Sequence, residues 1–212
     1  MATLDLQEQA QVDALKAWWR ANGKFVILGI VLALAVVAGM QYWKAHKADQ
    51  MSAAATLFEK LSTQAASGDI NGAGATATML INEYGASAYA PRAAMLAAQA
   101  DIQMGDPARA KSRLQWAINN ATDDSLKSLA RLNLAALLLD TQDYAGAMAQ
   151  LNAEHPASFN NLFSDLRGDV LSAQGKTEEA RAAYQQAYDQ MEQGVPYRNL
   201  IQMKLDMIGV AK

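Results

Sequence analysis

The sequence lacks cysteine altogether and has only two histidines and four prolines in 212 residues. Without cysteine the chain forms no disulfide and supplies no thiolate ligand to a metal. The two histidines, His46 and His155, lie far apart, and no HExxH pair, P-loop, dinucleotide fingerprint or GxSxG elbow occurs. We therefore expect no cofactor, no metal site and no catalytic residues, and predict that the protein is not an enzyme.

An excess of positive charge is lacking as well. The chain has 18 lysine and arginine residues against 21 aspartate and glutamate residues, and the charges are scattered. Because nucleic-acid affinity depends on neutralising phosphates, nucleic acid is excluded as a partner. Alternation of valine, isoleucine and threonine is also missing, whereas apolar residues recur at helical spacing, as in residues 129–139. The predicted fold class is therefore all-α.

One long apolar segment stands out. Residues 25–43 (FVILGIVLALAVVAGMQYW) contain no charge and include ten leucine, isoleucine, valine and phenylalanine residues. As a helix the segment is roughly 28 Å long, close to the ~30 Å hydrocarbon core of a bilayer. Its insertion is favourable by about 3 to 6 kcal/mol, and aromatic residues stand near both ends. The segment predicts a single membrane-spanning helix that anchors the protein in a lipid bilayer.

Two other interpretations of this segment are a buried helix of a soluble core and a cleaved signal peptide. The residues after 50 are amphipathic and need no such central helix, which disfavours the first interpretation. The residues before the segment are many and of mixed charge, and the apolar run exceeds the usual ~7–15 residues of a signal peptide. We therefore predict an uncleaved anchor.

The anchor divides the chain into four expected parts. These are an N-terminal tail (1–24), the anchor (25–43), a juxtamembrane linker (44–50) and a folded domain (51–212). Three basic residues shortly precede the anchor and two closely follow it, so the charge difference across the anchor is small. A short tail before a large domain is typical of an anchor with a cytoplasmic N-terminus, which is the orientation we predict. In the tail, Val12, Leu15 and Trp19 recur at helical spacing, which predicts an amphipathic helix that lies at the membrane interface or binds a partner.

The folded domain contains an internal repeat. Four short breakers are each followed five residues later by an alanine, at Gly68-Asp69 to Ala73, Gly105-Asp106 to Ala110, Gln142-Asp143 to Ala147 and Gly175-Lys176 to Ala180. The alanines are 37, 37 and 33 residues apart. A period near 34 residues is typical of stacked helix–turn–helix repeats.

The small residues indicate how each repeat packs. Twelve residues before three of the alanines stands another small residue, at Ala98, Ala135 and Gly168. We expect these positions to lie where two antiparallel helices come closest and only a small side chain fits. We also predict helix starts capped by Asp106, Asp123 and Thr177, with Pro107 at the first position of the helix after Asp106.

The pattern resembles the tetratricopeptide repeat, above all in AQGKTEEARAAYQQAYDQ (173–190). The first repeat departs from it with Gly72 and Gly74 in the second helix, and the third has Glu154 where a small residue is expected. The alternative is a helical bundle without repeats. We predict one N-terminal transmembrane helix followed by an α-solenoid of about four degenerate tetratricopeptide-like hairpins and a C-terminal helix.

A second resemblance covers nearly the whole chain. It rests on AQVDALKAWWRANGK (10–24), QYWKAHK (41–47), DLRGDVLSAQGKTEEARAAYQQA (165–187) and IQMKLDMIG (201–209). These segments are similar to the YfgM-type ancillary subunits of the bacterial SecYEG translocon. The resemblance implies a single-pass inner-membrane protein with a cytoplasmic N-terminus and a periplasmic repeat domain. It also implies association with the translocon and with a membrane-anchored periplasmic chaperone, PpiD, to which translocated proteins are handed over.

Stacked helical hairpins form a groove lined by the first helix of each hairpin, which suits helices or extended peptides. The register predicts groove positions at Arg92, Met95, Gln99, Leu132, Ala136, Asp165 and Asp169. Asp165 and Asp169 lie one turn apart on one helix face, and they are expected to face water, the favoured interpretation, to pair with neighbours of Arg167, or to bind a partner. A lysine–asparagine clamp for a carboxylate is not expected.

Together these observations predict a non-catalytic, membrane-anchored adaptor at the translocon. Other expected contacts are client polypeptides, the lipid bilayer through residues 25–43, and a second copy of the chain through an unpaired repeat edge. The alternative functions are a scaffold for another envelope assembly, such as division or cell-wall synthesis, and a helical enzyme whose site no motif reveals.

Overall fold

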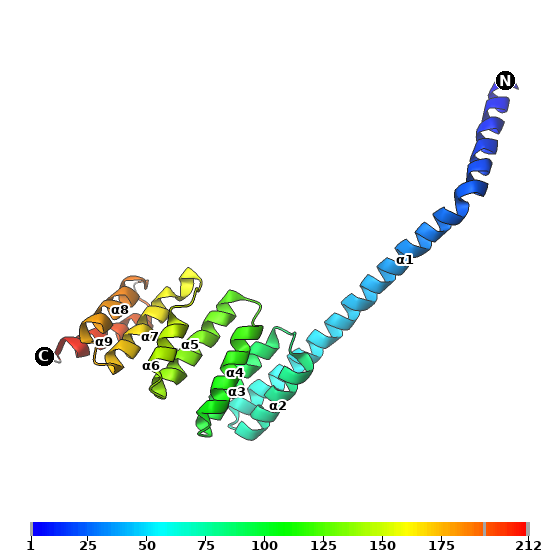
Figure 1. The fold of residues 1–212 in the computed structure, drawn as a ribbon. Coiled ribbons are helices and arrows are strands. Elements are labelled where there is room, and N and C mark those ends of the chain that lie inside the picture. The colour runs from blue at the N-terminus through cyan, green and yellow to red at the C-terminus, as the bar shows by residue number, and fades with distance from the viewer. Residues whose placement is uncertain (1, 193, 211–212) are drawn as a thin grey trace. The chain divides into compact units, whose positions relative to one another are not determined.

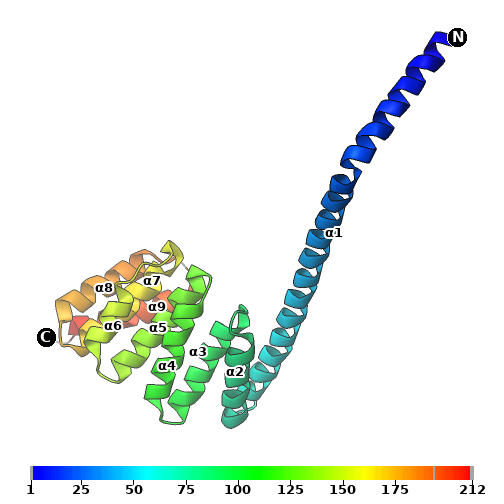
Figure 2. The ribbon, with the colours of Figure 1, turned by 45° about the vertical axis from the view of Figure 1, so that its right-hand side comes forward.

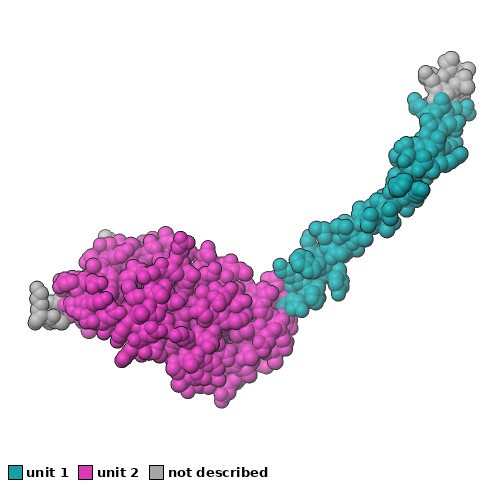
Figure 3. Space-filling view, viewed as in Figure 1, with its two compact units in different colours: residues 1–50 teal, residues 51–212 magenta. Residues whose placement is uncertain are grey.

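The structure is a computed structural model that describes residues 2–192 and 194–210. Within that part of the chain the regular structure is helical, which confirms the all-α prediction. The helices are α1 (Ala2–Ala66), α2 (Ile70–Tyr84), α3 (Tyr89–Gln103), α4 (Pro107–Asn120), α5 (Asp124–Asp140), α6 (Tyr144–Leu151), the 3-10 turn η1 (Ala157–Phe159), α7 (Asn160–Ala173), α8 (Thr177–Asp189) and α9 (Pro196–Val210). The chain falls into two compact units, residues 1–50 and 51–212 (Figure 3).

The first unit belongs to α1, whose helical conformation includes the apolar segment 25–43 and the following residues 44–50. This helix is long and apolar enough to cross a membrane, judged by its length and composition. Its large apolar side chains are exposed, from Phe25 at one end of the segment to Trp43 at the other. Lysine ammonium groups lie beside the aromatic rings at both ends, with Lys24 5.2 Å from the centre of Phe25 and Lys47 5.7 Å from that of Trp43.

The second unit is a stack of antiparallel hairpins. Residues 51–66 of α1 pair with α2, sharing an apolar cluster and the hydrogen bond from Thr76 to Gln64. The pairs α3–α4, α5–α6 and α7–α8 follow in chain order, with α9 packed on α8 (Figures 1 and 2). This arrangement confirms the prediction of four hairpins and a C-terminal helix. Three clusters of buried apolar side chains run through the stack, and the largest of them joins α3 to α7.

Each hairpin turns in the same way. The residue two places before the second helix has a positive φ, at Gly68 (+78°), Gly105 (+76°), Gln142 (+61°) and Gly175 (+76°). In the first three hairpins the next residue is an aspartate that caps the second helix, since its carboxylate accepts a 2.9 Å hydrogen bond from a backbone N–H. The caps predicted at Asp106 and Asp123 are confirmed, but the one at Thr177 is wrong, because α8 begins at Thr177 itself.

The four alanines of the repeat are all buried, as predicted for the points where paired helices come closest. Their partners Ala98 and Ala135 in the first helices are buried too, and Gly168 leaves no room for a larger side chain. At Gly168 an added Cβ would lie 2.5 Å from the ring of Tyr184, a side chain of α8 that is itself buried. The hairpin α7–α8 therefore requires glycine at this position.

A buried carboxylate joins α3 to α4. Asp101 is fully buried, and its two oxygens each accept a 2.6 Å hydrogen bond, one from Nε of Arg109 and one from Nε of Arg113. The equivalent positions of the next two hairpins, three residues after the small residue, are the buried leucines Leu138 and Leu171. The second hairpin therefore replaces an apolar core contact by two charge-assisted hydrogen bonds.

Changing Gly168 to alanine should lower the free energy of unfolding of the repeat unit by about 1–3 kcal/mol. The added methyl group forces the buried ring of Tyr184 to move, which is the usual cost of overpacking a core. Denaturant unfolding of the full-length protein in detergent, followed by circular dichroism, measures the change.

The matched control is Gly74→Ala in α2, where an added Cβ meets nothing within 4 Å. That variant should gain about 0.5–1 kcal/mol, because alanine favours the helix over glycine. Equal stability of the two variants would contradict the close approach at Gly168.

Candidate partner-binding face

Three of the predicted groove residues lie on α3 and differ in exposure. Arg92 is exposed, and its Nη1 donates a 2.7 Å hydrogen bond to the carbonyl oxygen of Ala88. Met95 is half-buried and packs against the largest apolar cluster. Gln99 is exposed and lines a hollow of ≈ 380 Å³. Two of these side chains are therefore accessible to a partner, and the third mainly supports the core.

The hollow beside Gln99 lies between the first two hairpins. Its walls are small or apolar side chains of α1, α2 and α3 together with three polar ones, namely Ser62, Ala65, Ala66, Ile70, Ala73, Leu96, Gln99, Ala100 and Gln103. Small side chains on facing helices leave this space open, and it is large enough to receive side chains of a partner. The amides at its edge offer hydrogen bonds to a peptide backbone.

On α5 the two predicted residues differ in burial. Leu132 is 9% exposed and belongs to the core, whereas Ala136 is half-exposed. Sequence reasoning missed two exposed apolar side chains of the first helices, Ile102 on α3 and Leu129 on α5. Leu129 stands three residues before Leu132, so helical spacing alone placed both near the same face without showing which one is free.

On α7 the predicted pair is already occupied by the chain itself. Lys204 of α9 lies between the two carboxylates, with its Nζ 2.8 Å from Oδ1 of Asp165 and 2.7 Å from Oδ1 of Asp169. The hydroxyl of Tyr197 donates to Asp165 and that of Tyr184 donates to Asp169 over 2.7 Å. Asp165 is 3% exposed, so the expectation that it faces water is wrong. Here the pair holds α9 on α7 and α8.

This cluster alters the protonation of its members. Burial raises the pKa of Tyr184, and the hydrogen bond to Asp169 and both carboxylate charges raise it further. Burial and the hydrogen bond to Asp165 likewise raise the pKa of Tyr197. Burial lowers the pKa of Lys204, but hydrogen bonds and attraction to the two carboxylates outweigh it, so that the pKa is raised. Neutral tyrosines and a charged lysine are therefore favoured in the folded state.

Sequence reasoning did not identify Tyr184, Tyr197 or Lys204 as part of this cluster. One signal was present in α9, where Tyr197, Ile201, Lys204 and Ile208 recur at helical spacing. A lysine within an otherwise apolar stripe faces the core, and such a charge needs a carboxylate partner. The partner itself lies 39 residues earlier in the chain, and no local pattern indicates it.

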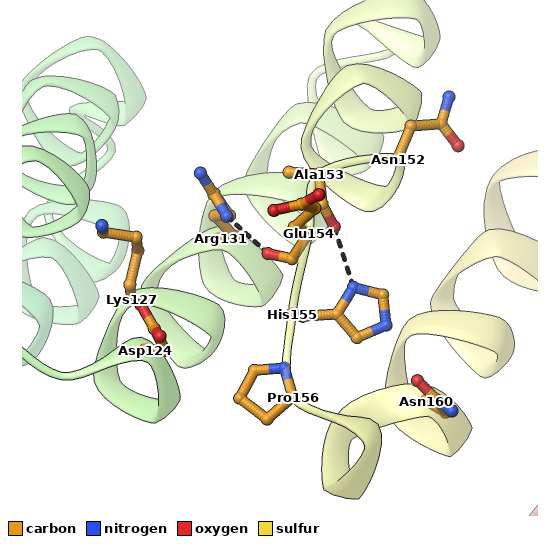
Figure 4. A pocket seen from close by; sticks show the side chains of 9 residues that line it. All are labelled: Asp124, Lys127, Arg131, Asn152, Ala153, Glu154, His155, Pro156 and Asn160. Carbon is orange, nitrogen blue, oxygen red and sulfur yellow. Dashed lines mark hydrogen bonds between the residues drawn. The ribbon is translucent and has the colours of Figure 1, made fainter.

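A larger, open hollow of ≈ 1000 Å³ lies between the start of α5 and the connection from α6 to α7 (Figure 4). Arg131 of α5 donates a 2.8 Å hydrogen bond from Nη1 to the carbonyl oxygen of Glu154. His155 donates from Nδ1 to the carbonyl oxygen of Ala153, and its ring stacks on Phe163 with the centres 3.8 Å apart. These contacts fix the connection, which gives His155 a structural role.

Comparison with known proteins identifies the family. A family model described as a tetratricopeptide repeat-like domain matches residues 16–210. A protein of Neisseria gonorrhoeae named ancillary SecYEG translocon subunit is 31% identical over 207 residues, which are 96% of this chain and 98% of that protein. This chain belongs to the ancillary SecYEG translocon subunits. The Escherichia coli protein of the same name is 26% identical and covers 84% of this chain and 85% of its own length.

A solved structure agrees with the fold of this family member. The crystal structure of the MamA protein covers 74% of this chain and 86% of its own, with a TM-score of 0.52 at 14% sequence identity. At this identity the likeness concerns the arrangement of helices alone. As an ancillary translocon subunit, the chain therefore combines one helix able to span a membrane with a tetratricopeptide-like stack.

The α7–α9 cluster predicts a loss of stability in alkali. Groups with a raised pKa in the folded state stabilise it fully below their ordinary values, near pH 10.0 for tyrosine and 10.5 for lysine. As the pH rises further the unfolded chain releases these protons first, so the free energy of unfolding should fall. Denaturant titrations between pH 8 and 11 measure the slope.

Changing Tyr197 to phenylalanine should reduce that slope, since one of the coupled groups is removed. Tyr144→Phe is the control, because no described hydrogen bond involves that hydroxyl. An unchanged slope in Tyr197→Phe would show that the cluster does not govern the alkaline transition.

Proposed function

We propose that this chain is a non-catalytic adaptor of the SecYEG translocon, anchored in the bacterial inner membrane by residues 25–43. Its repeat domain binds a membrane-anchored periplasmic chaperone of the PpiD type and helps to hand translocated proteins over to it. The observation that carries the proposal is the shared name of four relatives, whose matches cover 84% to 96% of this chain.

The architecture supports this proposal in two ways. One exposed apolar helix suits a lipid bilayer or the helices of a membrane complex. The stacked hairpins leave Arg92 on α3 exposed and Ala136 on α5 half-exposed, and Gln99 on α3 lines a hollow with small and apolar walls. Such a surface suits a peptide or a helix of a protein partner better than a small substrate.

Purification of the full-length protein in mild detergent should recover the translocon together with a periplasmic chaperone. A variant in which a cleavable signal peptide replaces residues 1–48 should reach the periplasm without the anchor. It should lose the translocon, because the tail and the anchor supply that contact, and should keep the chaperone. Quantitative mass spectrometry of both eluates measures the recovery. Isolation of a division or cell-wall complex in place of both partners would contradict the proposal.

The proposed orientation places the N-terminus in the cytoplasm and residues 51–212 in the periplasm. Because the chain has no cysteine, an introduced cysteine is its only thiol. Ser158→Cys and Ala10→Cys both replace exposed residues. A membrane-impermeant maleimide should label the first in intact spheroplasts and the second only after the membrane is broken. The reverse pattern would overturn the orientation.

A further inference from the structure

Helix α9 carries an apolar surface that its packing in the fold does not explain. Leu200, Met203 and Met207 are 43%, 60% and 73% exposed, and they are spaced three and four residues apart, so they lie on one side of the helix. Among the described residues of the second unit, Met203 and Met207 are the two most exposed large apolar side chains. We call these three residues the α9 stripe.

The other sides of α9 account for the fold and for its solubility. Ile201 is fully buried, and Leu205 and Ile208 pack beside it on the last apolar cluster. Asn199, Gln202 and Asp206 are exposed and give α9 the polar outer face that a terminal helix of a repeat stack needs. Since both tasks are met without the α9 stripe, its exposure points to a ligand.

Charged side chains flank the stripe on α9, since Lys204 stands three residues before Met207 and Asp206 three residues after Met203. Asp165 and Asp169 share the single ammonium group of Lys204, so the three side chains together carry one negative charge. Asp206 adds a second, and its carboxylate accepts a hydrogen bond only from the neutral amide of Gln202 among the described residues. A partner that covers the stripe therefore gains from a positive charge at its edge.

The nearby arginines do not cancel this charge at the stripe. Arg198 packs with its guanidinium 4.0 Å from the ring centre of Tyr188 on α8. Arg181, also on α8, points to the carbonyl oxygen of Ile208. Both cations thus lie on the side of α9 that meets α8.

We propose that the α9 stripe, flanked by Asp206 and by the Lys204 ammonium group with its two carboxylates, is a docking site for an apolar segment of a partner polypeptide that carries lysine or arginine beside its apolar residues. The inference deepens the proposed adaptor function and rests on it for the claim that the partner is a polypeptide. Exposed methionines suit this role, because their flexible side chains adapt to different apolar sequences. Complementary charge selects among such sequences and sets their orientation.

Three labelled peptides test the proposal by fluorescence anisotropy. The first is a helix-forming leucine–alanine peptide with lysines along one flank, the second has glutamates in place of the lysines, and the third has serines in place of the leucines. The full-length protein is held in nanodiscs of zwitterionic lipid, and empty nanodiscs measure binding to lipid. The lysine peptide should bind most tightly, and Asp206→Asn should weaken it by about two- to fivefold.

The double variant Met203→Ser/Met207→Ser should bind the lysine peptide roughly tenfold more weakly. Both side chains are exposed, so their replacement leaves the core intact, and the unfolding transition checks this. Met79→Ser is the matched control, since Met79 is 47% exposed on α2, and it should bind like the unaltered protein. Equal binding by all variants, or no preference for lysine over glutamate, would overturn the proposal.

Two further measurements distinguish this docking site from self-association and from the proposed adaptor function. If sedimentation shows a dimer that the double variant abolishes, the stripe binds a second copy and the polypeptide partner is wrong. The detergent purification described above is set beside the peptide binding of the unaltered protein. Recovery of the translocon without peptide binding overturns the docking site alone, whereas peptide binding without the translocon overturns the adaptor function and keeps the site.

Discussion

The contact between the two helices of each hairpin is the constraint on which the stack depends. Alanines are buried at this contact in each hairpin, and at Gly168 there is no room even for a methyl group. The glycine allows the ring of Tyr184 to approach α7 closely, and the hydroxyl of Tyr184 then reaches Asp169. The same close packing therefore fixes the charged cluster that holds α9.

Much of the fold was predictable because close packing of paired helices requires small residues at fixed spacing in the sequence. Small residues twelve apart, with a breaker before the second, predicted the hairpins and the buried alanines. The position of Glu154 shows where the pattern fails. Helix α6 ends at Leu151, so Glu154 lies in the following connection, where its carbonyl oxygen receives Arg131. A count of residues from an alanine assumes a full-length second helix, and this hairpin has a short one.

The polar contacts were less predictable, for a physical reason. Asp165 and Asp169 were correctly placed on one face, but their partner Lys204 belongs to a helix that stacks two elements later. Such pairs depend on how far one hairpin rotates against the next. Asp101 is a different case, because it stands where other hairpins carry Leu138 and Leu171. Comparison of the repeats with each other exposes a charge in a core position, and a buried charge demands partners.

The division of the surface follows from the same packing. Residues that stabilise the stack are buried against neighbouring helices. The side chains that stay exposed on the first helices and on α9 are accessible to partners. Attachment to a membrane-spanning helix of the same chain lowers the affinity that those exposed side chains must provide. A domain tethered at the membrane meets other tethered proteins at a high effective concentration, so modest contacts suffice for occupancy. Modest contacts also dissociate quickly, so such a domain exchanges partners rapidly.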